Sequence, residues 1–190
     1  MQLLYSEIFV RYLSCNMAPI IISGGPGAGK TTLLNALGDA GYATFPEGSR
    51  TLIEEQSQLT NGILPWTDLP AFAKLCLNLM SEQKRLASQH EVAFVDRAIP
   101  DIIGYLKMGQ CTVDEFYRVE SKGYYSQVFV CRPEASIYVQ DEVRPHSFEE
   151  AVQIHQLLCE TYVELGFKVI DVPWSSIEVR VEFVKSQLRL

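Results

Sequence analysis

The feature that most restricts the fold of this chain is a glycine-rich segment, GGPGAGKT, at residues 24–31. It follows a short apolar run rich in β-branched residues at positions 19–23, and it precedes a helical pattern at positions 30–40. Glycine permits the left-handed backbone conformations that a tight turn between a strand and a helix requires. A strand, a tight turn and a helix in this order are typical of α/β proteins built on parallel strands.

The rest of the chain repeats this alternation of short strands and helices. Strands are expected at residues 19–23, 42–45, 91–95, 127–131 and 167–172, and helices at residues 30–40, 49–59, 71–88, 101–108, 112–122, 148–166 and 177–190. Strands that alternate with helices form right-handed crossovers. The expected fold class is therefore α/β, a single domain with a five-stranded, mainly parallel sheet and helices on both faces.

Two of the expected helices have a recognisable start. Ser147 with Glu150, and Ser175 with Glu178, have the spacing of a capping box, in which each side chain satisfies a backbone N–H of the other residue. By contrast, the segment TNGILPWTDLP at residues 60–70 combines Asn-Gly with two prolines, so it predicts an ordered loop.

Composition excludes several classes of protein. The chain has 190 residues, of which 47% are hydrophobic, and this fits one globular domain. Its net charge of −7 opposes binding to nucleic acid, which requires neutralisation of phosphates. No apolar run approaches the roughly 18 residues that a membrane span needs, so we expect no membrane span and a cytoplasmic protein. The cysteines form no C-x-x-C pair, which argues against a disulfide framework or a zinc site.

Residues 1–18 are interpreted as an N-terminal extension to a domain that covers residues 19–190. A signal peptide is disfavoured, because Glu7 and Arg11 interrupt the apolar run and no basic segment precedes it. Two alternatives stay open for this segment: an extension from an upstream start, and a strand or helix used for packing or dimerisation.

Residues 24–31 match the pattern G-x-x-x-x-G-K-[ST], the P-loop, in the strand-to-helix context that this motif needs. Its backbone N–H groups would surround phosphate oxygens, and the Lys30 side chain would reach the β- and γ-phosphates of a nucleotide. Thr31 would give its hydroxyl to Mg²⁺, and Thr32 would hydrogen-bond phosphate. The predicted nucleotide-binding residues are Gly25, Pro26, Gly27, Ala28, Gly29, Lys30, Thr31 and Thr32.

The apolar run at residues 91–95 is followed by a carboxylate and a cation, Asp96 and Arg97. Both would lie at the carboxyl edge of the sheet, where parallel sheets bind their ligands. Asp96 would hold Mg²⁺ through water, and Arg97 would neutralise charge on a transferring phosphoryl group. A strand that ends in aspartate and a turn also occurs without a functional role.

The second expected strand, at residues 42–45, brings Glu47 to the same edge. A carboxylate there would position an acceptor hydroxyl or take its proton. The alternative role is electrostatic, because a negative charge near the start of the following helix is favourable by itself.

Residues 132–147 form a polar connector before a capped helix, in the place where a mobile lid would lie. Closure would bring Arg144 onto the nucleotide phosphates, and Arg132 is a second candidate for this role. The alternative is an ion-paired surface loop, since Asp141 and Glu142 lie near Arg144 in the sequence.

Four aromatic residues are candidates for an acceptor pocket above this edge of the sheet. Aromatic rings stack on planar substrates at a low entropic cost, although packing in the core is the alternative for each ring. These residues are Trp66, Phe72, Tyr105 and Tyr117.

On these motifs the chain resembles the small P-loop family described as an AAA domain, which is related to the nicotinamide riboside kinase domain and to nucleoside and nucleotide kinases. The resemblance runs from about Pro19 to the C-terminus. It rests on the segments GGPGAGKTTLLNAL, ATFPEGSRTLIEEQ, FVDRAIPDIIGYL and YVQDEVRPHSFEEAVQIHQLLCETYVELGFKVIDVP. It implies the strand order 2-3-1-4-5, and it supports roles for Glu47, Asp96, Arg97 and Arg144. It does not imply an AAA+ motor, because the chain is too short for the helical lid domain of that class.

The expected function is binding of Mg·ATP and transfer of the γ-phosphoryl group to a small nucleoside- or nucleotide-like acceptor. Mg²⁺ would be held by Thr31 and Asp96. The expected catalytic residues are Lys30, Glu47, Asp96, Arg97 and Arg144. The alternative is a switch with slow hydrolysis, in which ATP or GTP orders the lid for a partner. The sequence lacks the N-K-x-D motif by which Ras-like GTPases read guanine, and this favours ATP.

Overall fold

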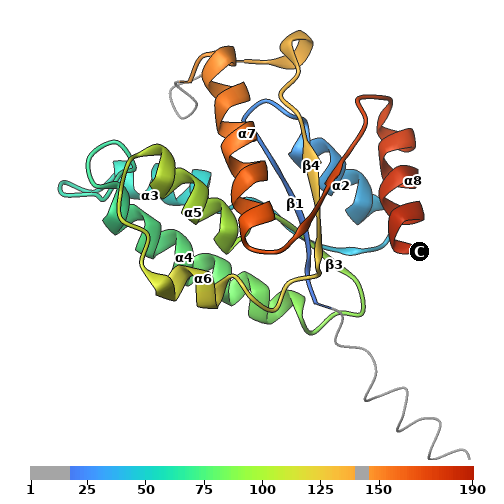
Figure 1. Ribbon diagram of the computed structural model, residues 1–190, viewed down its shortest axis with the longest axis horizontal. Coiled ribbons are helices and arrows are strands. Elements are labelled where there is room, and N and C mark those ends of the chain that lie inside the picture. Colours follow the sequence, from blue (N-terminus) through green and yellow to red (C-terminus); the bar gives the residue numbers. More distant parts are fainter. Residues whose placement is uncertain (1–17, 140–145) are drawn as a thin grey trace, which may run out of the picture.

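A computed structural model of the protein describes residues 18–139 and 146–190 (Figure 1). Its strands are β1 (Ile20–Gly24), β2 (Ala43–Phe45), β3 (Ala93–Asp96), β4 (Gln127–Cys131) and β5 (Lys168–Asp171). They pair in the order β2-β3-β1-β4-β5, and each of these pairings is parallel. The expected α/β class, the five-stranded sheet and its strand order are therefore confirmed.

The central strand β1 is buried at every position of its sequence IIISG. Such a continuous apolar run is typical of a parallel strand that has helices on both faces. Ile21 pairs in register with Val95 of β3 and with Val128 of β4, so three β-branched side chains lie side by side. The carboxyl ends of these strands consequently meet at one edge, at the top of Figure 1.

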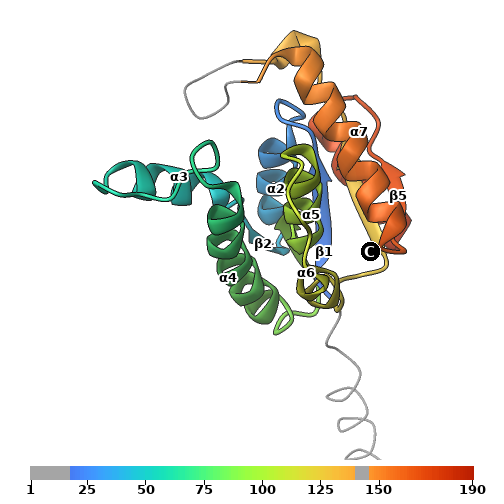
Figure 2. The same cartoon turned by 60° about the vertical axis from the view of Figure 1, so that its left-hand side comes forward.

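Helices cover both faces of the sheet. They are α2 (Lys30–Asp39), α3 (Ser49–Ser57), α4 (Leu69–Ala87), α5 (Ile99–Met108), α6 (Glu115–Glu120), η1 (Ala135–Ile137), α7 (Phe148–Glu164) and α8 (Ile177–Leu188). On one face α2 packs against α8. On the other face α5 contacts α4, α6 and α7, while α3 projects away from the sheet beside α4 (Figure 2).

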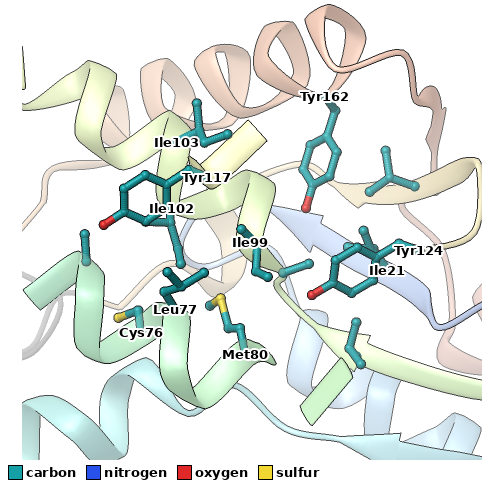
Figure 3. Packing of buried hydrophobic residues seen from close by; sticks show 14 of the residues in the cluster. Ile21, Cys76, Leu77, Met80, Ile99, Ile102, Ile103, Tyr117, Tyr124 and Tyr162 are labelled. Carbon is teal, nitrogen blue, oxygen red and sulfur yellow. The ribbon is translucent and has the colours of Figure 1, made fainter. Parts of the chain in front are cut away.

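Each face of the sheet buries its own hydrophobic cluster. The cluster under α4, α5, α6 and α7 is shown in Figure 3, where Cys76, Leu77 and Met80 of α4 face Ile99 and Ile102 of α5. The other cluster joins α2 and α8 to the opposite face. Because the apolar side chains lie over the faces, the polar residues that follow each strand are left at the carboxyl edge.

The helix boundaries differ from the expected ones where a cap was not recognised. α4 begins at Leu69, earlier than expected, because the Asp68 side chain caps it by accepting a hydrogen bond from the backbone N–H of Ala71 at 3.0 Å. α5 also begins earlier than expected, and Pro100 lies in its first turn. Backbone N–H groups of the first turn have no partner within the helix, so a proline there costs no hydrogen bond.

One of the two expected capping boxes is present and the other is wrong. Glu150 accepts from the Ser147 N–H at 2.6 Å, and the Ser147 hydroxyl accepts from the Glu150 N–H at 3.2 Å. α8 instead begins after Ser176, whose side chain makes no cap hydrogen bond. Glu178 therefore lies one position too early to complete a capping box, and Ser175 lies outside the helix.

Membrane-spanning helices and disulfides can be assessed within the residues that the structure describes. No helix in residues 18–139 or 146–190 is both long enough and apolar enough to span a membrane. The four cysteines that fall within these ranges are all free.

Gly24 ends β1 with a φ of +128°, and it lies close to the neighbouring strand. A Cβ at this position would overlap the backbone carbonyl of Cys131 in β4. The chain can therefore leave the sheet and enter the glycine-rich turn in this register only with glycine at position 24.

We expect Gly24→Ala to destabilise the protein by about 1–3 kcal/mol more than Gly41→Ala. Both residues have a positive φ, +128° and +95°, so both substitutions strain the backbone, but nothing lies within 4 Å of a Cβ at Gly41. Urea unfolding followed by circular dichroism measures the difference. Equal losses in the two variants would show that the close approach to β4 is not what requires glycine.

Candidate functional site

The turn between β1 and α2 forms a cradle that contains the predicted nucleotide-binding residues 25–32. Gly27 and Gly29 both have a φ of +68°, a left-handed conformation that glycine adopts at little cost. Thr31 and Thr32 are exposed in the first turn of α2. The backbone thus has the form that a P-loop requires, at the N-terminus of a helix.

Lys30 is buried in this cradle, with 6% of its surface exposed. Its ammonium group donates to the carbonyl oxygen of Gly25 at 3.0 Å, so the side chain folds back over its own loop. Burial lowers the pKa of Lys30, and the positive charge of Arg97 lowers it further. An anion in the cradle would relieve both effects, because it stabilises the charged form.

The connector that follows β4 packs directly on the cradle. Pro133 and Tyr138 occupy the space that Cβ atoms at Gly25 and Gly27 would need. The Tyr138 hydroxyl donates to the carbonyl oxygen of His146 at 2.7 Å, which ties the two described parts of the connector together. The described part of the expected lid thus lies against the phosphate-binding loop.

The two arginines expected in the lid have different outcomes. Arg144 lies outside the described residues. Arg132 is exposed and forms two hydrogen bonds with Asp171 of β5, at 3.1 and 2.9 Å. Arg132 therefore matches the ion-paired alternative.

Asp96 ends β3, paired in register with Ile22 of β1. It is 1% exposed, and neither of its carboxylate oxygens has a hydrogen-bond partner among the described residues. Burial raises the pKa of Asp96 to about 6, with a contribution from Glu47, while Lys30 and Arg97 oppose the rise. An unpartnered buried carboxylate is unusual and needs a reason.

The Asp96 oxygens fit a hard cation. Mg²⁺ prefers oxygen ligands and is usually held by only one or two carboxylates, with phosphates and water completing its shell. Thr31 offers an exposed hydroxyl from the first turn of α2. In the described segments no group of three His, Cys, Asp or Glu residues is placed to hold a metal by itself, so a cation here would depend on bound phosphates.

Glu47, Arg97 and Asp101 form a chain of charged side chains beside the cradle, in which Arg97 and Asp101 are buried and Glu47 is partly exposed. Arg97 donates from Nε to Glu47 at 3.0 Å and from Nη1 to Asp101 at 3.1 Å. Arg97 is also left-handed, with a φ of +66°, and its N–H donates to the carbonyl of Ile22 at 2.9 Å. The structure thus brings the expected residues Glu47 and Arg97 into direct contact.

Asp101 is a member of this site that sequence analysis missed. Besides Arg97, it accepts hydrogen bonds from the Ser23 hydroxyl at 2.6 Å, the Ala98 N–H at 2.9 Å and the Tyr162 hydroxyl at 2.5 Å. The available signal was its position in the first turn of the helix that follows Arg97. Its partners Ser23 of β1 and Tyr162 of α7 are distant in the sequence, so no local sequence pattern indicates these contacts.

Arg180 is a second residue that sequence analysis missed. It is 4% exposed behind the cradle, where it donates to the Cys131 sulfur at 3.1 Å and lies over the Trp174 ring at 5.6 Å. None of the carboxylates in the described segments forms a salt bridge with it. Arg180 thus adds a positive charge close to the phosphate-binding loop.

The charges around Glu47 determine its protonation. Burial opposes ionisation, but the charges of Arg97 and Lys30, with a hydrogen bond from Ser49 at 2.5 Å, lower the pKa of Glu47 to about 2. Glu47 is therefore a carboxylate at neutral pH and a weak base. It is better suited to accept a hydrogen bond from a hydroxyl than to take the proton of that hydroxyl.

A cavity of about 400 Å³ opens beside the cradle. It is lined by Pro26 and Lys30 of the cradle and by the whole charge chain of Glu47, Arg97 and Asp101. Side chains of α3, α4 and α5 complete its walls. The cavity therefore connects the phosphate-binding loop to a chamber between these helices.

Three of the four aromatic candidates line this cavity. They are Trp66, which is 57% exposed, Phe72, and Tyr105, whose ring faces the Arg97 guanidinium at 5.4 Å. Tyr117 does not line the cavity. It is buried in the core between α4, α5 and α6, which was the alternative for each ring.

Comparisons with known proteins identify a family. A family model described as an AAA domain matches residues 19–180. No curated protein matches the chain.

Solved structures match nearly the whole chain. Deoxyadenosine kinase from M. mycoides is 17% identical with a TM-score of 0.55, over 90% of this chain and 98% of that chain. Shikimate kinase from Acinetobacter baumannii, in complex with shikimate, is 15% identical with a TM-score of 0.56, over 91% and 94%. NadR protein in complex with NR is 18% identical with a TM-score of 0.65, over 91% of this chain and 51% of that chain. This chain thus spans about half of NadR, and at such identities the matches show a kinase-like P-loop fold.

We expect Asp96→Asn to make the protein without ligand more stable by about 1–3 kcal/mol at pH 7. Folding raises the pKa of Asp96 from its usual 3.8 to about 6, so between these pH values the folded state binds more protons than the unfolded chain. Stability is therefore lost as the pH rises through this window, and the advantage of the variant should vanish near pH 4.

Urea unfolding at pH 4 and pH 7 measures this difference. Asp39→Asn, at an exposed position of α2, is the matched control and should change stability by less than about 0.5 kcal/mol. Equal stabilities of wild type and Asp96→Asn at pH 7 would contradict a destabilising carboxylate.

Proposed function

The chain belongs to the AAA-domain family, and from this membership and the site geometry we propose that it is an ATP-dependent phosphotransferase. Mg·ATP binds in the cradle, and the γ-phosphoryl group passes to a hydroxyl of a small acceptor in the adjoining cavity. A nucleoside- or nucleotide-like acceptor is the expectation from sequence. Because shikimate kinase has a similar fold, the fold itself leaves the acceptor class open.

The observation that carries this proposal is the continuity of the cavity with the cradle. Lys30 belongs to both. Glu47 and Arg97, the residues proposed to meet the acceptor and the transferring phosphoryl group, also line the cavity. Phosphoryl transfer depends mainly on positioning the two substrates and on stabilising charge. A chamber that opens beside the phosphate-binding loop meets the first requirement.

Each site residue has a role in this proposal. The backbone of residues 25–30 and the Lys30 side chain hold the phosphates. The Thr31 hydroxyl and the unpartnered Asp96 carboxylate bind Mg²⁺, which supplies positive charge to the phosphate oxygens. Arg97, and Arg144 from the lid, stabilise charge on the transferring group.

Glu47 orients the acceptor hydroxyl by accepting its hydrogen bond. Its lowered pKa, about 2, makes it a poor proton acceptor in the ground state. The transition state of phosphoryl transfer is loose, with little bond formation to the attacking oxygen, so orientation contributes more than early deprotonation.

A nucleotide-dependent switch is the second candidate function, and the packing of Tyr138 on Gly27 favours it. Phosphates that bind in the cradle would contact the phosphate-binding loop, against which Tyr138 packs at Gly27. The connector would then report nucleotide binding to a partner, with slow or no turnover of ATP or GTP.

We expect ADP release from Mg·ATP to depend on an added acceptor. The panel contains nucleosides, mononucleotides and nicotinamide riboside, and Lys30→Ala is the background control, because it removes the phosphate-binding ammonium group. Nucleotide binding without acceptor-dependent ADP release across the panel would favour the switch.

We expect Glu47→Gln to lower acceptor-dependent ADP release by about 10²-fold while ATP binding persists. The amide keeps the size of the side chain but loses the charge that orients the hydroxyl. Glu54→Gln is the matched control, since Glu54 is exposed on α3 and forms an ion pair with Arg50 at 3.6 Å. Unchanged transfer in Glu47→Gln would restrict Glu47 to its electrostatic role at the helix start.

A further inference from the structure

We propose that the acceptor is a neutral alcohol with an apolar body, held by hydrophobic contacts with α4 and α5, and not a nucleoside read through the edge of its base. This inference rests on the proposed phosphotransferase function. It concerns the end of the cavity that lies away from the phosphates.

The ionic groups of the cavity are concentrated beside the cradle and largely satisfy one another. Glu47 receives hydrogen bonds from Arg97 and Ser49, and Asp101 receives four, including one from Arg97. The hydroxyl of an acceptor fits here, beside the exposed part of Glu47, whose side chain is 29% exposed. Asp101 has no such access, since it is 1% exposed.

Most of the side chains that α4 and α5 contribute to the cavity are apolar. α4 contributes Phe72, Cys76 and Met80, and α5 contributes Ile102, all of them at most 6% exposed. Figure 3 shows Cys76 and Met80 on α4, across from Ile102 of α5. Burial raises the pKa of the Cys76 thiol to about 12, so this wall carries no charge at neutral pH.

A nucleobase would find few partners on these walls. The described lining contains no asparagine or glutamine, the side chains that pair with adenine in two places at once. Arginine pairs with guanine in this way, but the buried Arg97 already donates to Glu47 and Asp101. The remaining polar side chains of the lining are partly or fully exposed to solvent; they are Ser49, Arg50, Tyr105 and His146. Buried donors and acceptors of a base would lose their hydrogen bonds to water without replacement, whereas an apolar body loses none.

The size and flexibility of the cavity also suit an apolar chain or ring. A volume of about 400 Å³ lies near the lower end of the range for small-molecule sites. Met80 and Met108 both line it, and methionine adapts its shape to irregular apolar ligands. These walls thus select by shape and hydrophobicity.

The test compares two classes of acceptor at fixed Mg·ATP. Geraniol and cinnamyl alcohol are the apolar alcohols, and thymidine and adenosine are the nucleosides. ADP release gives the KM for each, and we expect values at least tenfold lower for the apolar alcohols. Calorimetry with geraniol, in the presence of Mg²⁺ and a non-hydrolysable ATP analogue, measures binding without turnover.

Two variants alter the apolar wall. Cys76→Phe fills the chamber, and Met80→Gln places an amide there with little change in size; each should raise the KM for geraniol at least tenfold. Val163→Phe puts the same ring as the first variant on an exposed position of α7, 62% exposed, and is the matched control. Thermal melting shows whether either variant fails to fold. In that case the KM of the remaining variant, Cys76→Phe or Met80→Gln, is the test.

The outcomes separate this inference from the proposed function. A lower KM for thymidine or adenosine would overturn the apolar acceptor and leave the phosphotransferase intact. Saturable geraniol binding that Cys76→Phe abolishes, without ADP release from either class, would support the apolar ligand and overturn the phosphotransferase. Absence of geraniol binding to the wild type would overturn the inference.

Discussion

The site depends on one buried charge, the guanidinium of Arg97. It is 5% exposed and lies between Glu47 at 3.0 Å and Asp101 at 3.1 Å. Glu47 follows β2, Arg97 follows β3, and Asp101 lies in α5, where Ser23 of β1 and Tyr162 of α7 donate hydrogen bonds to it. A buried charge that loses its partner costs about 3–5 kcal/mol. The elements that form this edge of the sheet must therefore stay together, and the same requirement holds the site in shape.

The backbone at Arg97 is part of this constraint. A left-handed conformation at a residue other than glycine costs about 1–3 kcal/mol and persists only where its surroundings enforce it. Here the φ of +66° turns the chain from β3 into α5 within a short connection, and the N–H of Arg97 remains bonded to Ile22. The ion pairs of the side chain compensate for the strain. Position 97 thus combines a backbone requirement with a charge requirement, and neither can be changed alone.

Sequence reasoning succeeds where the signal is local. The apolar strands, the glycine-rich turn and the charged residues directly after each strand are read from short segments, and parallel pairing then brings Glu47 and Arg97 to one edge. It misses Asp101, whose partners Ser23 and Tyr162 are distant in the sequence. It also cannot assign Tyr117 to the core, because an aromatic ring after a strand or in a helix fits either environment. These details depend on how helices pack over the sheet, which no single segment specifies.

The carboxylate of Asp96, which has no hydrogen-bond partner among the described residues, has a consequence for the abundance of the protein in a cell. A group that weakens the empty fold, and that a bound cation would satisfy, links folding to the supply of ligand. Under the proposed function, molecules without ligand would open more often and be exposed to proteolysis, and molecules with bound nucleotide and cation would be protected. The steady-state amount of this protein would then follow the availability of its nucleotide and cation, without any change in synthesis.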